Sequence, residues 1–223
     1  MADEKLISYL EEFITEERKN IFQSVLEDRT RHFTVVLEDL YQKHNTSAIT
    51  RTCDVFGVQD MHIIENKYNA YMSGQVGKGS QKWLTFHKYN EKEHNTQDCI
   101  DNLRANGYQI VATTPHEKSN FVGDFDVTKK SAFVFGVEKE GVSEMMLEQA
   151  DAHLKVPMYG FTESLNVSVA AAIVLQDVTT RVRGTETEWQ LENLEKREVY
   201  LKWLQKSIKS IDKIMKRYHE ELD

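Results

Sequence analysis

The sequence predicts an α/β fold: a mostly parallel sheet flanked by helices, with helical extensions at both ends. Between residues 29 and 183, short runs rich in β-branched and aromatic residues alternate with amphipathic stretches. Runs such as QIVATT at 109–114 and AFVFGV at 132–137 are apolar on both faces, which is typical of strands in a covered parallel sheet. We therefore expect one α/β domain at 29–183, with helical extensions at 1–28 and 184–223.

The elements follow in order along the chain. The N-terminal extension spaces its apolar residues, from Leu6 to Val25, as amphipathic helices do. The first strand of the domain reads HFTVVLED, and later strands alternate with helical stretches in the same way. We expect strands at 32–39, 61–66, 84–89, 108–114, 132–137 and 153–158, and helices at 47–56, 96–105, 143–149 and from about 165 onward.

The C-terminal extension repeats apolar residues at spacings of three, four and seven. Such a seam packs on a partner helix, which is either the N-terminal extension or a second subunit. An independent coiled coil is the alternative. The seam consists of Leu194, Leu201, Leu204, Ile208, Ile211, Met215, Tyr218 and Leu222.

Composition excludes several classes of protein. No run approaches the roughly 20 apolar residues of a membrane-spanning helix, and the first residues are acidic rather than leader-like, so we expect a cytoplasmic protein. Cys53 and Cys99 stand far apart without a CxxC pair, so we interpret them as buried thiols. The eight histidines form no HExxH or other ligand spacing, and we expect no metal site.

A basic and aromatic window contrasts with the net charge of −8. No carboxylate occurs between Glu65 and Glu91, and four lysines there are interleaved with rings such as that of Trp83. Cations neutralise phosphates and aromatic faces stack on bases, so the window is suited to binding a flexible polyanion such as a nucleic acid. An ordinary sheet edge with solvated lysines would look similar.

The first polar strand-to-helix junction is HNTSAITRTCDVFG at 44–57. Asn45 or Ser47 is predicted to cap the helix, and Arg51 follows Ser47 by one turn. Parallel sheets place ligands at the carboxyl ends of their strands, where these residues are expected. A plain cap with a surface cation is the alternative interpretation.

Two further junctions have the same character. FGVEKEGVSEMM at 135–146 places Gly136, Glu138 and Gly141 between an apolar strand and a helix, although a simple turn would look similar. The stretch 155–175 leaves a strand through Pro157, and Ser164 and Asn166 stand at the head of a helix rich in small residues. A simple helix cap would not require this combination of a proline-containing loop and two polar residues, so we interpret the stretch as part of a site.

Other common sites are missing. The GKGS stretch at 77–80 lacks the spacing of a phosphate-binding P-loop, and no GxGxxG or GxSxG motif occurs. Taken together, the three junctions resemble the three motifs of the SPOUT superfamily of RNA methyltransferases. Within it they are most similar to the SpoU or TrmH-type ribose 2'-O-methyltransferases. The stretches at 28–45 and 77–83 look most like the branch acting on guanosine 18 of the tRNA D-loop.

The resemblance implies an S-adenosylmethionine-dependent homodimer with a C-terminal trefoil knot, the SPOUT fold. It places the catalytic arginine on Arg51, its supporting asparagine on Asn45 and the acid on Glu138. The polar pair of the third motif falls on Ser164 and Asn166. Backbone groups that hold the cofactor map onto Thr113, Gly136, Val156 and Leu165.

For the chemistry, we expect Arg51 to anchor a phosphate and to stabilise the developing alkoxide. A guanidinium with a pKa above about 12 is a poor base at neutral pH. RNA is expected along Arg29, Arg31, Lys43, His44, Lys78, Lys82 and Lys88. The alternatives are a 23S rRNA guanosine methyltransferase of the same family and a catalytically silent knot-fold scaffold that binds RNA or protein.

Overall fold

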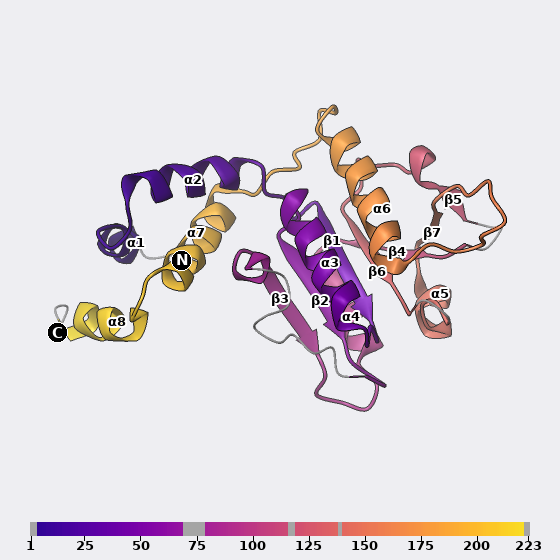
Figure 1. Cartoon of the computed structure of the whole chain (residues 1–223), viewed down its shortest axis with the longest axis horizontal. Coiled ribbons are helices and arrows are strands. Elements are labelled where there is room, and N and C mark those ends of the chain that lie inside the picture. Colours follow the sequence, from indigo (N-terminus) through magenta and orange to yellow (C-terminus); the bar gives the residue numbers. More distant parts are fainter. Residues whose placement is uncertain (1–3, 69–78, 116–118, 138–139, 221–223) are drawn as a thin grey trace. The chain divides into compact units, whose positions relative to one another are not determined.

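The computed structural model of the chain describes residues 4–68, 79–115, 119–137 and 140–220 (Figure 1). It divides into two compact units: residues 30–189, and the two terminal segments 1–29 and 190–223 together. None of the described helices is long and apolar enough to cross a membrane.

The unit 30–189 is built on one seven-stranded sheet in which every pairing is parallel. The strand order is β3-β2-β1-β6-β4-β7-β5. This confirms the predicted parallel α/β fold. The strands are β1 (Phe33–Glu38), β2 (Asp60–Ile64), β3 (Thr85–Tyr89), β4 (Gln109–Thr113), β5 (Asn120–Phe121), β6 (Ser131–Phe135) and β7 (Ala152–Lys155).

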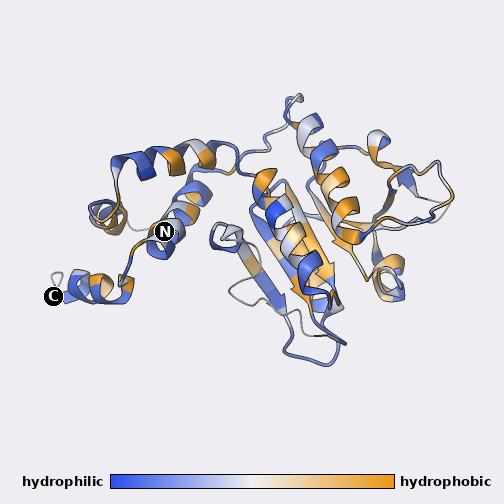
Figure 2. Cartoon of the chain, in the orientation of Figure 1, coloured by the Kyte–Doolittle hydropathy of each residue, from blue (hydrophilic) through white to orange (hydrophobic). Residues whose placement is uncertain are grey.

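Helices cover both faces of the sheet because its strands bury alternate side chains on opposite sides. Along β1, Val35 packs in the core beneath α3 (Lys43–Val55) and α6 (Val167–Val182). Val36 packs in the other core, beneath α4 (Thr96–Ala105) and α5 (Glu144–Gln149). The central strands of the sheet are mostly hydrophobic, whereas the edge strand β3 is largely hydrophilic (Figure 2). Short 3-10 turns, η1 (Ser80–Lys82) and η2 (Val122–Asp124), complete this unit.

One predicted helix start was wrong. The helix expected from Ser47 begins four residues earlier, at Lys43, and the residue before it, Gln42, makes no side-chain cap. Asn45 and Ser47 are therefore inside the helix rather than at its cap. Both cysteines are free and fully buried, as predicted: Cys53 in α3 and Cys99 in α4.

The terminal unit packs α7 (Asn193–Ser207) against α1 (Glu4–Glu11) and α2 (Glu16–Glu27). The rings of Phe22 and Trp203 meet edge to face with centroids 5.5 Å apart. The predicted packing of the seam on the N-terminal extension is confirmed, and its members Leu204, Ile208 and Tyr218 are buried. The seam is not one continuous helix, because α7 ends at Ser207 and Ser210, whose φ is +58°, precedes α8 (Ile211–Glu220). Leu194 of the seam is exposed, and the buried face of α7 combines the seam residue Leu204 with Val199, Tyr200 and Trp203.

Candidate functional site

A cavity of about 360 Å³ lies at the carboxyl ends of the central strands. Because all strands run parallel, the loops that follow β4, β6 and β7 meet at this edge. We call it the junction cavity. The four residues expected to hold the cofactor line it together, along with one expected catalytic residue: Thr113, Gly136, Val156, Leu165 and Ser164.

Backbone shapes one wall of the junction cavity. Gly141 donates to the carbonyl of Val137 at 2.8 Å, and Val137 donates to the carbonyl of Gly141 at 3.0 Å. The loop closes so tightly that a Cβ on Gly136 would lie 2.0 Å from the carbonyl oxygen of Gly141. Only glycine fits at position 136, and the positive φ of Gly141 (+73°) also favours glycine.

The walls combine apolar side chains with exposed backbone and few charges. Phe135, Leu154 and Val174 provide apolar surface, while Glu140, Lys155 and Glu163 bring charge to the lining. A volume of this size, mostly apolar with a few polar groups, is characteristic of small-molecule sites.

The first and third junctions meet through two asparagines. Nδ2 of Asn166 donates to Oδ1 of Asn45 at 3.1 Å. Asn166 also caps α6, where its Oδ1 accepts from the backbone N–H of Ser168 at 2.9 Å. Asn45 is 2% exposed, and its own Nδ2 donates to Oε1 of Gln42 at 2.9 Å. Each amide is thus fixed in orientation by a second partner.

The other expected catalytic residues are placed differently. Arg51 is exposed on α3, six residues or roughly 9 Å of helix beyond Asn45, and does not line the junction cavity. Ser164 lines the cavity from an exposed loop. Glu138 lies outside the described residues. The structure therefore gathers the expected cofactor residues and Ser164 around one cavity, and it pairs Asn45 with Asn166. Neither asparagine is among the residues that line the cavity, and Arg51 joins neither group.

Of the expected RNA-binding residues that the structure describes, two are largely buried and four are exposed. Arg29 is 2% exposed and its guanidinium lies 5.3 Å from the ring centroid of Trp203, which contradicts its expected contact with RNA. Arg31 is mostly buried, and its Nε donates to Oδ2 of Asp60 at 3.0 Å. Lys78 lies outside the described residues. The exposed members are Lys43, His44, Lys82 and Lys88.

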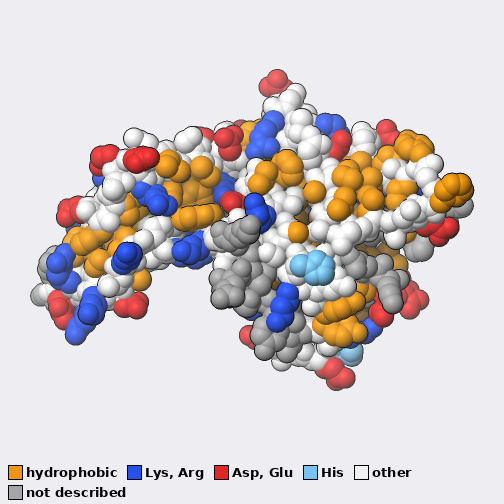
Figure 3. All heavy atoms as spheres, viewed as in Figure 1, with side chains coloured by type: hydrophobic (Ala, Val, Ile, Leu, Met, Phe, Trp, Pro, Cys, Tyr) orange, Lys and Arg blue, Asp and Glu red, His pale blue; other side chains and the backbone are white. Residues whose placement is uncertain are grey.

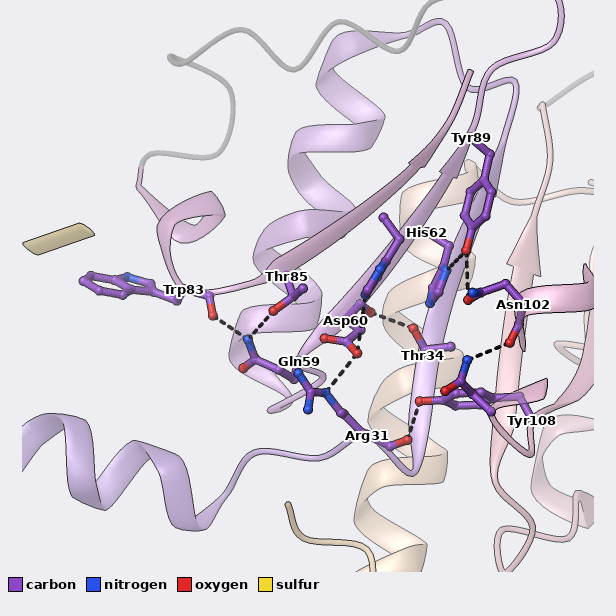
Figure 4. Close-up of polar contacts among 12 residues, drawn as sticks. Arg31, Thr34, Gln59, Asp60, His62, Trp83, Thr85, Tyr89, Asn102 and Tyr108 are labelled. Carbon is purple, nitrogen blue, oxygen red and sulfur yellow. Dashed lines mark hydrogen bonds and ion pairs between the residues drawn. The ribbon is translucent and has the colours of Figure 1, made fainter. Parts of the chain in front are cut away.

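Arg31 belongs to a polar cluster at the amino ends of β1 and β2, away from the junction cavity (Figure 4). His87 lies 3.6 Å from Asp60 and stacks on His62 with centroids 4.5 Å apart. Burial alone would raise the pKa of Asp60, but the nearby imidazole of His87 and the charge of Arg31 bring it below its usual value. Burial, assisted by the charge of His87, lowers the pKa of His62 to about 3.

One basic surface was missed from the sequence. All eight Lys and Arg residues of the C-terminal extension lie between positions 196 and 217, with only Glu198 and Asp212 among them. The excess of positive charge at 196–217 is visible in the sequence, but the net charge of the whole extension 184–223 hides it because acidic residues flank this stretch. Three lysines are exposed here: Lys202 on α7, Lys209 in the turn that follows it, and Lys213 on α8. Burial and the nearby Lys202 lower the pKa of Lys206, as expected where cations are crowded.

Comparison with known proteins gives consistent similarities. Residues 32–176 match the SpoU rRNA Methylase family. A tRNA (guanosine(18)-2'-O)-methyltransferase of Borreliella burgdorferi is 39% identical over 206 residues, covering 92% of this chain and 93% of that protein. A Thermus thermophilus protein of the same name is 38% identical over 161 residues, covering 72% and 81%. The crystal structure of the A. aeolicus TrmH/SpoU tRNA modifying enzyme matches with a TM-score of 0.76 at 31% identity, covering 87% of this chain and 98% of that one.

Proposed function

Because the chain belongs to the SpoU rRNA methylase family, we propose that it methylates the 2'-hydroxyl of a ribose in RNA, using S-adenosylmethionine. Guanosine 18 of the tRNA D-loop is the proposed target, since relatives that align over most of their length carry that activity in their names. The observation that carries the proposal is the junction cavity, where three loops distant in sequence supply one wall each.

The junction cavity fits the cofactor in chemistry. Its apolar residues Phe135, Leu154 and Val174 suit an adenine ring, and the close approach of Gly136 to Gly141 leaves backbone groups at the surface for polar contacts. Thr113, Gly136, Val156 and Leu165 would hold the cofactor. When bound, it supplies an electrophilic methyl group on a sulfonium.

The residues of the chain contribute mainly by positioning. Holding the ribose oxygen in line with the reacting methyl group contributes on the order of 7–11 kcal/mol through prepaid orientation entropy. Asn45 and Asn166, each oriented by a second hydrogen bond, are proposed to fix the ribose side of the site. Arg51 is proposed to anchor the adjacent phosphate and stabilise the alkoxide. Ser164, in the cavity wall, and Glu138 complete the proposed set.

We place RNA along the exposed Lys43, His44, Lys82 and Lys88 in the unit 30–189 and along the basic stretch 196–217 in the terminal unit. Dense positive charge attracts phosphates whatever the base sequence, so these residues contribute affinity and not specificity. The overall charge of −8 then reflects acidic side chains elsewhere.

A second copy of the chain is proposed to cover an exposed apolar surface on the same unit. Val169 and Ile173 are exposed on α6, and Tyr159 and Phe161 are almost fully exposed in the loop before it. Figure 3 shows hydrophobic side chains gathered over α6 and this loop. Such patches mark interfaces. Since Arg51 lies apart from its own cavity, a homodimer also offers a route for an arginine to reach a neighbouring cavity. The trefoil knot and a cytoplasmic location stay predictions.

The decisive test uses unmodified tRNA transcripts and cofactor labelled in its methyl group. We expect label at one ribose, and none when position 18 carries 2'-deoxyguanosine, because the acceptor hydroxyl is then absent. Label in a 23S rRNA transcript instead would favour the ribosomal alternative. Calorimetry with S-adenosylmethionine separates the enzyme from a silent scaffold, which need not bind the cofactor.

A further inference from the structure

A buried carboxylate, Glu38, ends the central strand β1 beside the junction cavity. It is 3% exposed and accepts three hydrogen bonds. Its Oε1 accepts from the hydroxyls of Thr96 at 2.9 Å and Ser143 at 2.8 Å, and its Oε2 accepts from the backbone N–H of Ser143 at 2.8 Å. Three donors converge on one group, which suits an ionised carboxylate because that group only accepts.

Ser143 connects Glu38 to the cavity wall. Its hydroxyl donates to Glu38 and accepts from the backbone N–H of Met146 at 3.2 Å, so it caps α5. The preceding residue, Val142, and Leu147 in α5 both line the junction cavity. Glu38 therefore fixes the point where the loop that begins at Gly136 enters the helix.

The next residue, Asp39, holds a second loop beside the same wall. Its φ is +55°, a conformation that Asp tolerates better than most residues. Its Oδ1 accepts from the backbone N–H groups of Asn66 at 2.7 Å and Lys67 at 2.8 Å. Nζ of Lys67 in turn lies 3.4 Å from Oε2 of Glu140, which lines the cavity. The Lys67–Glu140 ion pair is exposed and therefore weak. The buried hydrogen bonds of Glu38 are therefore expected to stabilise the cavity wall more than this ion pair does.

We propose that Glu38 is a positioning residue for the cofactor site, acting through Ser143 to hold the cavity wall at 140–143 in its binding conformation. This rests on the proposed function of the junction cavity. Burying a carboxylate is costly, and a well-packed apolar residue is often at least as stabilising. An ionised group at this position is explained by the three donors that it orients at the end of the loop.

The test compares Glu38→Gln with the wild type in the full chain. The amide cannot accept all three hydrogen bonds, and its NH2 group would face donors. We expect the Kd for S-adenosylmethionine, measured by calorimetry, to rise about tenfold, as for the loss of one charged hydrogen bond. The Kd for tRNA should stay within about twofold. In the cofactor-free protein, amide hydrogen exchange at 140–147 should become faster.

The matched control is Asp60→Asn, which neutralises another buried carboxylate at the opposite ends of the strands. It should leave the cofactor Kd and the exchange at 140–147 unchanged. Ser143→Ala, at an exposed position, should reproduce the effect of Glu38→Gln, and the double variant should be no worse than either single one. If Glu38→Gln does not fold, Thr96→Val carries the test, because it removes one donor to Glu38 and leaves the cap of α5 intact.

A Glu38→Gln protein that loses thermal stability, yet keeps the wild-type cofactor Kd and exchange at 140–147, would overturn the inference. If the wild type itself binds no S-adenosylmethionine, the proposed function fails. In that case, faster amide hydrogen exchange at 140–147 in Glu38→Gln would still support the role of Glu38 in positioning this loop. Unchanged exchange would refute that role in addition to the proposed function.

Discussion

Asn166 donates its side-chain amide to the amide oxygen of Asn45 at 3.1 Å, across 121 positions of sequence. The contact joins the helix that follows β1 to the loop that follows β7. Neither residue is free to rotate, because Gln42 fixes Asn45 and Ser168 fixes Asn166. The ribose side of the proposed site is thus preorganised before any ligand binds.

Asn166→Ser separates the two roles of this residue. Serine keeps the oxygen that caps α6 but loses the donor to Asn45, so we expect near-wild-type stability and methyl transfer reduced on the order of 100-fold. Asn166→Ala loses both roles and should lower the free energy of unfolding by about 1 kcal/mol as well. Denaturant titration and single-turnover methylation measure the two effects. Equal activity in Asn166→Ser and the wild type would refute the role of the pair.

Arg51→Lys tests bidentate anchoring. Lysine keeps the charge but not the planar pair of donors, so we expect methyl transfer to fall at least about tenfold while the tRNA Kd changes little. Arg104→Lys, on the opposite face of the sheet, is the control and should keep full turnover. Near-wild-type turnover in Arg51→Lys with unchanged RNA affinity would exclude this role.

The basic stretch of the terminal unit predicts a salt-dependent contact with RNA. Replacing Lys202, Lys209 and Lys213 by Gln should reduce the slope of log Kd against log salt by about two to three. Lys92→Gln/Lys129→Gln/Lys130→Gln, elsewhere on the surface, is the control with equal charge loss. Filter binding from low to moderate salt measures the slopes. Identical slopes for the two triple variants would remove this stretch from the RNA surface.

His62 makes stability depend on pH. Burial lowers its pKa from 6.5 to about 3, so the unfolded chain binds a proton that the folded one does not. The contribution of neutral His62 to the free energy of unfolding is fully present above pH 6.5. It is lost as the pH falls towards 3, and the free energy of unfolding then decreases by up to about 1.4 kcal/mol per pH unit. His62→Gln should flatten the free energy of unfolding in this window, whereas His94→Gln, at an exposed position, should not. A wild-type slope retained by His62→Gln would contradict the assignment.

The central strands β1, β4 and β6 could be predicted from the sequence because each carries an apolar run. The two-residue strand β5 was not predicted, since it is exposed and has no such run. The start of α3 could not be predicted, since Ser47 is a good cap by type while the observed helix begins at Lys43 without a side-chain cap. In the C-terminal extension, regular spacing predicted one seam, and its members Leu204 and Tyr218 are buried, but the helix ends at Ser207 and the buried face of α7 also includes Trp203. Local patterns do not contain the tertiary contacts that decide these points.

The site shows the same division. The resemblance named Thr113, Gly136, Val156 and Leu165, and the structure gathers them around one cavity. Glu38 was not singled out, because a charged residue at the end of a strand looks like a surface position until Thr96 and Ser143 are seen to close over it. Arg29 was misjudged for the converse reason, since its cationic side chain is buried against Trp203.

The most direct test of the account is a crystal structure of the full chain with S-adenosylhomocysteine, the demethylated product. The account predicts the ligand in the junction cavity, against Thr113, Gly136, Val156 and Leu165, with its sulfur facing the Asn45–Asn166 pair. Ligand density at another place would contradict the account. So would an empty junction cavity in crystals grown at a saturating concentration of S-adenosylhomocysteine.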